Sequence, residues 1–420
     1  MLTGIGITLT PSVFPGKLKH MEDIPFISPV GWHRGTMAPN AREACFFFTS
    51  RGKIAFMNMD GSSLRFLEFN RPNQITWQLA DFFPDGNRIL LLSMEQRRDG
   101  PGKSFEEYYT QTPTHIWTYD LPTGELTELA THNRMAVFYT PSLLLGEDRM
   151  LVQVSQKNRG QIFNMNLDGS DAQPFTLAGE GFPYGLSLSP DGQKVAFHIA
   201  GNKGYQVFTS DIYGKNRVRI AAKAGHLYFG TSWSPDGQWV LYADCYETMD
   251  PGHDWADVCI GRPDGSECHI LTSSQSMWFA ATYGGPGMHG GGSNLASWTR
   301  DGQILFPRRF PHSKVAWEYQ PDHPDTDHFN RDYKPELSRG GVQICRINIH
   351  TGEIKALTQY RDGLWDFRAS QSPDGKNIIF CRAETGDVPA IWIMDNDGKK
   401  RRRLTKGFND QGADHPQWKP

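Results

Sequence analysis

The stretch LSPDGQKVAFHI at residues 188–199 decides the fold of this chain, because its pattern returns along the whole sequence. Proline presets the φ angle at the first turn position, aspartate bonds to its own backbone, and glycine accepts a positive φ. Short apolar runs rich in β-branched and aromatic residues flank the turn, which is typical of strands. The other six copies of this strand–turn–strand phrase are FFPDGNRILLL (82–92), WSPDGQWVLYA (233–243), WTRDGQILFP (298–307), QSPDGKNIIFC (371–381) and the weaker MAPNAREACFFF (37–48) and LLGEDRMLVQV (144–154).

A second phrase follows each copy and consists of a short apolar run, a tight turn and another short strand, as in IFNMNLDGSDAQPF (162–175). No segment keeps an apolar period of 3.6 residues with helix caps, so we expect few helices. One unit therefore contains four antiparallel strands, A to D, and a lone unit cannot bury both of its faces. The centres of the second turns are Asp60-Gly61, Thr123-Gly124, Asp168-Gly169, Tyr213-Gly214, Asp264-Gly265, Thr351-Gly352 and Asp397-Gly398.

These units predict an all-β fold, a seven-bladed β-propeller of four-stranded antiparallel blades that forms a single domain over residues 1–420. The final residues DHPQWKP (414–420) resemble the strand A phrase FGTSWSP (229–235), but no strand B follows them. We therefore expect them to join the sheet formed by residues 41–69, so that pairing of the N- and C-terminal segments closes the ring. The predicted blades are approximately 37–69 plus 414–420, 76–129, 135–176, 183–221, 228–272, 293–358 and 365–405.

Composition and charge exclude several classes of protein. Aromatic residues make up 12% of the chain, which is enough for a large core and argues against disorder. The formal net charge of −3 leaves no basic excess for nucleic acid, and no apolar run of about 18 residues spans a membrane. The six cysteines form no C-x-x-C pair, and the N-terminus lacks the basic region of a signal peptide. We expect buried free thiols, a cytoplasmic location, and no nucleic-acid or membrane partner.

The long insertions predict where a ligand binds. They cover residues 95–114, 245–256, 273–292 and 308–340, and all four fall at B–C or D–A connections, which share one face of a propeller. Long loops in a compact domain are usually functional, so we place the site around the central channel on that face. Ionisable side chains there could instead be solvated or bond to neighbouring carbonyl groups. The candidates near the starts of the A strands are His33, Arg34, Trp77, Gln78, Arg134, Tyr139, Tyr184, His226, Tyr228, His289, Asn294, Trp365, Asp366, Arg368, His415 and Gln417.

The repeated SPDG…IAF…DxDG…LT phrase resembles the TolB-type (WD40-like) propeller repeat over essentially the whole chain. Within that superfamily, four segments are similar to the oligogalacturonate lyase group of propeller polysaccharide lyases: GWHRGTM (31–37), KSFEEYYTQTPTHIWTYDLPTGELTEL (103–129), GDVPAIWIMD (386–395) and ADHPQW (413–418). The resemblance implies an enzyme of carbohydrate metabolism that cleaves uronate-containing oligosaccharides by β-elimination. It also implies a divalent cation, Mn²⁺ or Ca²⁺, near the C-terminal phrase, where His415 and Gln417 are the candidate ligands.

β-Elimination from a uronate requires a cation beside the carboxylate, a base for the C5 proton and an acid for the leaving oxygen. We assign the acid/base role to His33, with His226 or Tyr228 as its partner. The candidates that would bind the substrate carboxylate are Arg34, Arg134 and Arg368, because a guanidinium binds a carboxylate at two points. The remaining candidates, which would bind the sugar, are Trp77, Gln78, Tyr184, His289, Asn294, Trp365 and Asp366.

The alternative is a non-catalytic TolB-like propeller that binds a protein or a glycan. The chain has no G-x-S-x-G motif, which argues against a peptidase of the prolyl-oligopeptidase kind. The two surviving functions differ at the channel mouth. A lyase needs a His or Tyr beside an Arg there, whereas a binding scaffold would present an uncharged or apolar face.

Overall fold

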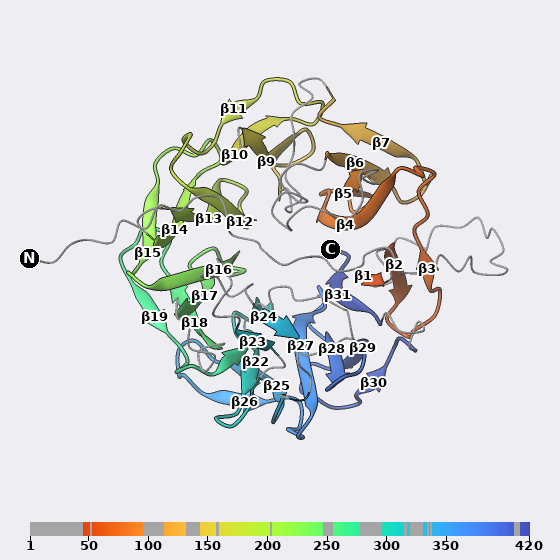
Figure 1. Ribbon diagram of the computed structural model, residues 1–420, viewed down its shortest axis with the longest axis vertical. Helices are drawn as coiled ribbons and strands as arrows, with labels where there is room; N and C mark the ends of the chain where they lie inside the picture. The colour runs from red at the N-terminus through yellow and green to blue at the C-terminus, as the bar shows by residue number, and fades with distance from the viewer. Residues whose placement is uncertain are drawn as a thin grey trace, which may run out of the picture.

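The computed structural model describes residues 45–50, 53–95, 113–131, 143–156, 159–201, 204–246, 255–277, 296–314, 317–319, 331–333, 336, 338–406 and 412–420. Within these ranges the regular elements are all β-strands, and the sheets are arranged around a centre as in a propeller (Figure 1). The predicted all-β class is therefore confirmed. No helix in the described ranges has the length and apolar character needed to cross a membrane.

Four separate sheets have four antiparallel strands each. In three of them the strands follow chain order, and Figure 1 shows β4 and β12, the first strands of two of these sheets, toward the centre of the ring. They are β4 (Gln74–Phe82), β5 (Arg88–Glu95), β6 (Thr114–Asp120) and β7 (Leu126–Leu129); β8 (Leu143–Leu144), β9 (Arg149–Gln156), β10 (Arg159–Asn166) and β11 (Gln173–Pro174); and β12 (Phe182–Leu188), β13 (Lys194–Gly201), β14 (Gly204–Asp211) and β15 (Val218–Ala222).

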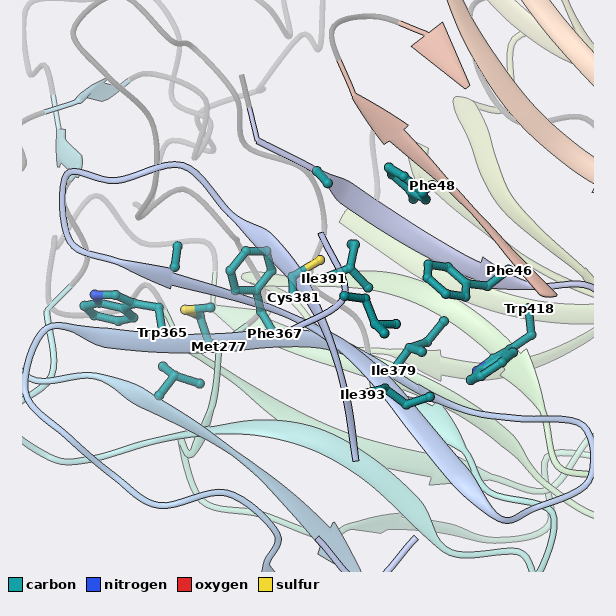
Figure 2. Close-up of a cluster of buried hydrophobic side chains, with 14 of the residues drawn as sticks. Phe46, Phe48, Met277, Trp365, Phe367, Ile379, Cys381, Ile391, Ile393 and Trp418 are labelled. Atoms are coloured by element: carbon teal, nitrogen blue, oxygen red, sulfur yellow. The ribbon is translucent and has the colours of Figure 1, made fainter. Parts of the chain in front are cut away.

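The fourth of these sheets joins the two ends of the described chain. It has the order β3 (Arg65–Phe66), β2 (Lys53–Asn58), β1 (Cys45–Ser50) and β31 (Asp414–Trp418). The β31 strand runs antiparallel to β1, with Phe46 opposite Trp418 and their rings 5.9 Å apart, side by side in Figure 2. The predicted closure by pairing of the terminal segments is thus confirmed.

The other large sheet has thirteen strands and contains three antiparallel runs. One parallel residue pair, Val342 with Trp365, and the short strand β20 (Ser276–Met277) connect the runs. Because the described sheets give four separate four-stranded units, the predicted count of seven blades is not confirmed and stays a prediction, as do the blade boundaries. The runs are β16 (His226–Trp233), β17 (Val240–Tyr246), β18 (Trp255–Gly261) and β19 (Cys268–Ile270); β21 (Ser297–Trp298), β22 (Ile304–Arg309), β25 (Val342–Ile347) and β26 (Ile354–Ala356); and β27 (Leu364–Gln371), β28 (Asn377–Glu384), β29 (Ala390–Asp395) and β30 (Arg402–Arg403). A separate pair consists of β23 (Trp317–Tyr319) and β24 (Arg331–Tyr333).

The repeated phrases fold through repeated hydrogen bonds. At four PDG-type turns a Ser or Thr hydroxyl donates to the turn aspartate at 2.6 Å, which rigidifies the turn. At four outer strands a Thr hydroxyl accepts the amide of the neighbouring strand at 2.9 Å. The donors at the turns are Ser189, Ser234, Thr299 and Ser372, and the accepting threonines are Thr176, Thr272, Thr358 and Thr405.

Tryptophans link three innermost strands, β16, β21 and β31, to the innermost strand of the neighbouring unit. The indole of Trp233 donates to the carbonyl of Ser187 at 2.9 Å, and the indole of Trp418 donates to the carbonyl of Ser370 at 3.1 Å. Trp298 makes the same kind of bond. Because buried indole N–H groups need a partner, each bond fixes the relative position of two innermost strands. All six cysteines are free thiols, five of them buried as predicted and Cys268 exposed.

Candidate functional site

The innermost strands share a backbone irregularity at one equivalent position. In β12, β16 and β27 the pairing register shifts at a bulge, and the residue six positions before the turn aspartate has a positive φ. Two of these residues are glycines, Gly185 (φ 67°) and Gly230 (φ 66°), but the third is Arg368 (φ 50°). In β31 the equivalent residue is His415 (φ 52°), three residues before Trp418 as Gly230 is before Trp233. Side chains other than glycine pay about 1 kcal/mol in this conformation and are concentrated at functional sites.

Arg368 and His415 both lie beside the carboxylate of Asp414. Arg368 forms an ion pair with Asp414, and both side chains are largely buried. The imidazole Nδ1 of His415 lies 3.5 Å from Asp414, and its backbone amide donates to Asp414 at 2.7 Å. The thiol of Cys381 lies 3.2 Å from the same carboxylate. These four residues form a connected polar cluster on the innermost strands β27 and β31 and the adjoining strand β28.

His415 is recessed within the ring but keeps contact with solvent. Its side chain is 48% exposed, yet protein atoms surround it. This enclosure lowers the pKa of His415 to about 4, and the nearby positive charge of Arg368 lowers it further, while Asp414 acts in the opposite direction. At neutral pH the imidazole is therefore uncharged.

The neighbouring β27 candidates are held by packing. Asp366 is fully buried and forms a two-point ion pair with Arg382, at 2.6 and 2.8 Å. Trp365 is also fully buried, and its indole donates to Thr385 at 2.8 Å (Figure 2 shows the ring within the core). Neither side chain offers a free surface to a ligand in this structure, so their sugar-binding roles stay predictions.

A second cluster begins at His226, the first residue of β16. Its Nδ1 lies 2.6 Å from Asp244 on β17, and Asp244 pairs across the sheet with Asp257 on β18. Asp257 accepts hydrogen bonds from Thr272 (3.0 Å) and from the amide of Ser274 (2.5 Å). Burial raises the pKa of both carboxyl groups. This is the arrangement of a carboxylate that orients an imidazole.

The remaining described candidates lie in separate places. Tyr228 is 3% exposed and belongs to the apolar core between two sheets, where burial raises its pKa strongly. Trp77 is 8% exposed, with its ring 4.1 Å from Phe69. Tyr184 packs edge-on against His198 at 3.7 Å. Gln78 lies opposite Leu92, and Gln417 lies opposite Phe47.

Several predicted residues lie outside the described ranges, namely His33, Arg34, Arg134, Tyr139, His289 and Asn294. The proximity of His33, Arg134 and Arg368, on which the predicted chemistry depends, therefore stays a prediction. Sequence reasoning missed the partners Asp244, Asp257, Asp414 and Cys381. A signal was present for Asp414, which directly precedes the predicted metal ligand His415.

Among the residues that the structure describes, those around His415 and Gln417 do not fit a divalent cation. Asp414, the carboxylate beside them, already pairs with Arg368, so a metal would have to displace a guanidinium. Across the described ranges, no group of three or more His, Cys, Asp or Glu side chains is placed to hold a metal ion. The predicted site thus lacks a suitable donor set among these residues.

A hollow of about 390 Å³ lies at the opposite ends of the strands, among the turns. Ser189–Asp191 and Pro235–Gln238 from the PDG turns and Arg262–Asp264 from a C–D turn line it, together with Lys194 and Trp233. Its carboxylates serve mainly to hold their own turns, as Asp191 and Asp236 do through Ser189 and Ser234. None of the predicted site residues lines it.

No family model matches the sequence, and no curated protein matches it. Among solved structures, the chain is similar to oligogalacturonate lyase from Vibrio parahaemolyticus, with 12% identity, coverage of 87% of this chain and 86% of that one, and a TM-score of 0.51. An oligogalacturonate lyase in complex with manganese gives 14% identity, coverage of 88% and 89%, and a TM-score of 0.50. A putative TolB from Agrobacterium tumefaciens gives 13% identity, coverage of 76% and 89%, and a TM-score of 0.43. The likeness shows the fold, and the predicted resemblance to these propellers is supported.

Proposed function

We propose that this protein is a lyase-like enzyme that cleaves uronate-containing oligosaccharides by β-elimination. The observation that carries the proposal is the placement of Arg368 and His415 on neighbouring innermost strands. They occupy, in strained backbone conformations, the position that is glycine in β12 and β16. A cation and an uncharged imidazole beside one another are two of the three groups that the reaction requires.

In the proposed reaction the guanidinium of Arg368 lies beside the substrate carboxylate and stabilises the negative charge that develops there. The imidazole of His415 accepts the C5 proton. The electron pair of the broken C5–H bond forms the C4=C5 double bond as the C4–O bond breaks. The leaving oxygen then takes a proton from an acid, for which His33 remains the first candidate. No step passes through a divalent cation, because the donors around His415 do not fit one.

Two broader predictions belong to the same proposal. We propose that the three antiparallel runs of the thirteen-stranded sheet are three blades, which with the four separate sheets make seven. In the cytoplasm, the proposed partner is an acidic oligosaccharide, attracted locally because the formal net charge is only −3.

The test is the ultraviolet absorbance of unsaturated uronate products. We expect purified protein to generate this signal from at least one member of a panel of pectic, gum and glucuronan oligosaccharides, measured with and without Mn²⁺ or Ca²⁺. Arg368→Lys should lower the rate because a lysine binds a carboxylate at one point only. His33→Ala should lower it if His33 is the acid. Absence of product across the whole panel would favour the non-catalytic, ligand-binding propeller.

A further inference from the structure

Arg309, the last residue of β22, has an unusual setting. Its guanidinium carbon lies 4.4 Å from the ring centroid of Trp255, the first residue of β18. Its Nε donates to the carbonyl of Ser274 at 2.6 Å, and its backbone amide donates to the carbonyl of Gln275 at 2.8 Å. The aromatic face and the Nε bond to Ser274 fix the orientation of the planar guanidinium, and the amide bond to Gln275 holds the backbone of Arg309.

Described residues from three of the four long insertions contact one another at this guanidinium. Trp255 belongs to insertion 245–256, Ser274 to insertion 273–292, and Arg309 to insertion 308–340. These segments are far apart in sequence, yet their described residues contact one another directly. Since long loops of a compact domain concentrate binding functions, the point where three of them converge is a natural place for a ligand.

The charge of Arg309 has no counterpart among the described residues. No described carboxylate lies within 4.0 Å of its guanidinium, whereas several other described arginines, such as Arg149, Arg217 and Arg382, pair with an Asp or Glu. The site is half-buried, and this burial lowers the pKa of Arg309 to about 10, so the group is still charged at neutral pH. A partly desolvated cation is costly unless an anion pairs with it.

Arg262 provides a matched comparison within the same chain. It also stacks on a tryptophan, with its guanidinium carbon 3.8 Å from the ring centroid of Trp239. Unlike Arg309, it pairs with a carboxylate, Glu267, at 3.4 Å, and it lies at a tight turn on the opposite side of the molecule. Stacking on an aromatic ring therefore does not by itself explain why Arg309 lacks a carboxylate partner in the described structure.

The nearest acidic network is already engaged elsewhere. Ser274 connects the two features, because its carbonyl accepts from Arg309 while its amide donates to Asp257. Asp257 is also bound by Thr272, and its neighbour Asp244 is held by His226. The carboxylates thus hold the loop that positions Arg309 without neutralising it.

We propose that Arg309, oriented by Trp255 and Ser274, binds the carboxylate of a ligand that enters from the long-loop side. The planar fork of the guanidinium suits a two-point contact with a carboxylate. Two sources of this group are distinguished by experiment: a uronate within an oligosaccharide and a small organic acid. The site goes beyond the proposed lyase function, because a carboxylate can bind there whether or not the protein cleaves its ligand.

The test measures binding to the intact protein by isothermal titration calorimetry, so it requires no turnover. The probes are sodium digalacturonate, its dimethyl ester and sodium succinate. We expect at least one of the two acids to bind, and digalacturonate to bind more tightly than its ester. Arg309→Met should weaken binding by about tenfold or more, and Arg309→Lys should weaken it less. The control Arg262→Met should leave it unchanged.

The outcomes distinguish the two sources of the carboxylate, and they test the Arg309 site separately from the lyase function. Arg309-dependent binding of digalacturonate supports a sugar-acid site, and such binding of succinate alone supports an organic-acid site. The site is overturned if Arg309→Met binds every bound acid as tightly as wild type does, if digalacturonate binds but its ester binds equally tightly, or if neither acid binds. If Arg309→Met does not fold, the lysine variant and the ester comparison on wild type still decide. If the protein binds an acid through Arg309 but cleaves no oligosaccharide, only the lyase proposal is refuted. If it cleaves an oligosaccharide but Arg309→Met binds as wild type does, only the Arg309 site is refuted.

Discussion

Replacing His415 by glycine separates function from stability at the proposed catalytic position. The residue has a φ of 52°, which costs a non-glycine side chain about 1 kcal/mol. Glycine relieves this strain, but its greater freedom in the unfolded chain costs roughly 0.5–1 kcal/mol. The lost imidazole has only a 3.5 Å approach to Asp414, while the backbone amide keeps its 2.7 Å bond to that carboxylate. We therefore expect the free energy of unfolding to change by less than about 1 kcal/mol.

The same substitution at Arg368 should behave in the opposite way. Arg368→Gly relieves similar strain but removes the cation that pairs with the largely buried Asp414, which should cost about 3–5 kcal/mol. Urea unfolding of both variants measures these differences, and product absorbance measures activity. His415→Gly should be folded and inactive. A loss of stability above about 2 kcal/mol in that variant would show that His415 is structural, and full activity would remove its role as the base.

Three further predictions concern the rest of the fold. Trp418→Ala should destabilise the protein by about 3–5 kcal/mol in urea unfolding, because it removes the indole bond to Ser370 and the contact with Phe46 that help to close the ring; a loss below about 1 kcal/mol would contradict this role. Burial raises the pKa of Asp81 to about 6, so the folded state binds this proton more tightly than the unfolded state does. The stability that the proton contributes is complete below about pH 4 and is lost as pH rises through about 6. In urea unfolding at a series of pH values, Asp81→Asn should remove this part of the pH dependence. In the folded protein only the exposed Cys268 should react rapidly with a thiol reagent, and fast reaction of a second thiol would indicate local opening.

Local chemistry explains what could be predicted from the sequence. The hydrogen bonds of the PDG turns join residues within five positions of one another, as at Ser189 and Asp191. The local sequence is therefore enough to predict the geometry of these turns. The closing strand could be recognised because 414–418 repeats a phrase found elsewhere in the chain. Both predictions needed only local propensity and the chain's own repetition.

The orientation of the candidate side chains could not be predicted in the same way. A bulge moves every following side chain to the other face of its strand, and the innermost strands bulge near the candidate residues. Trp77 and Trp365 are predicted to bind the sugar, and the sequence pattern did not show that their side chains are only 8% and 0% exposed in this structure. Partners from other strands, such as Asp244 for His226, depend on register, which the sequence pattern does not specify.

The chain's own repeat provides the strongest functional argument, because it supplies an internal reference. At the bulge of the innermost strand, Gly185 and Gly230 have the residue that the backbone favours, whereas Arg368 and His415 do not. Among tryptophan-stacked arginines, Arg262 has its carboxylate partner and Arg309 has none in the described structure. In the first comparison glycine adopts the positive φ without strain, whereas Arg368 and His415 adopt it at a cost. In the second, the charge of Arg262 is paired, whereas that of Arg309 has no carboxylate partner among the described residues. The ion pair with Asp414 gives Arg368 a role within the fold, whereas a ligand would account for the positions of His415 and Arg309.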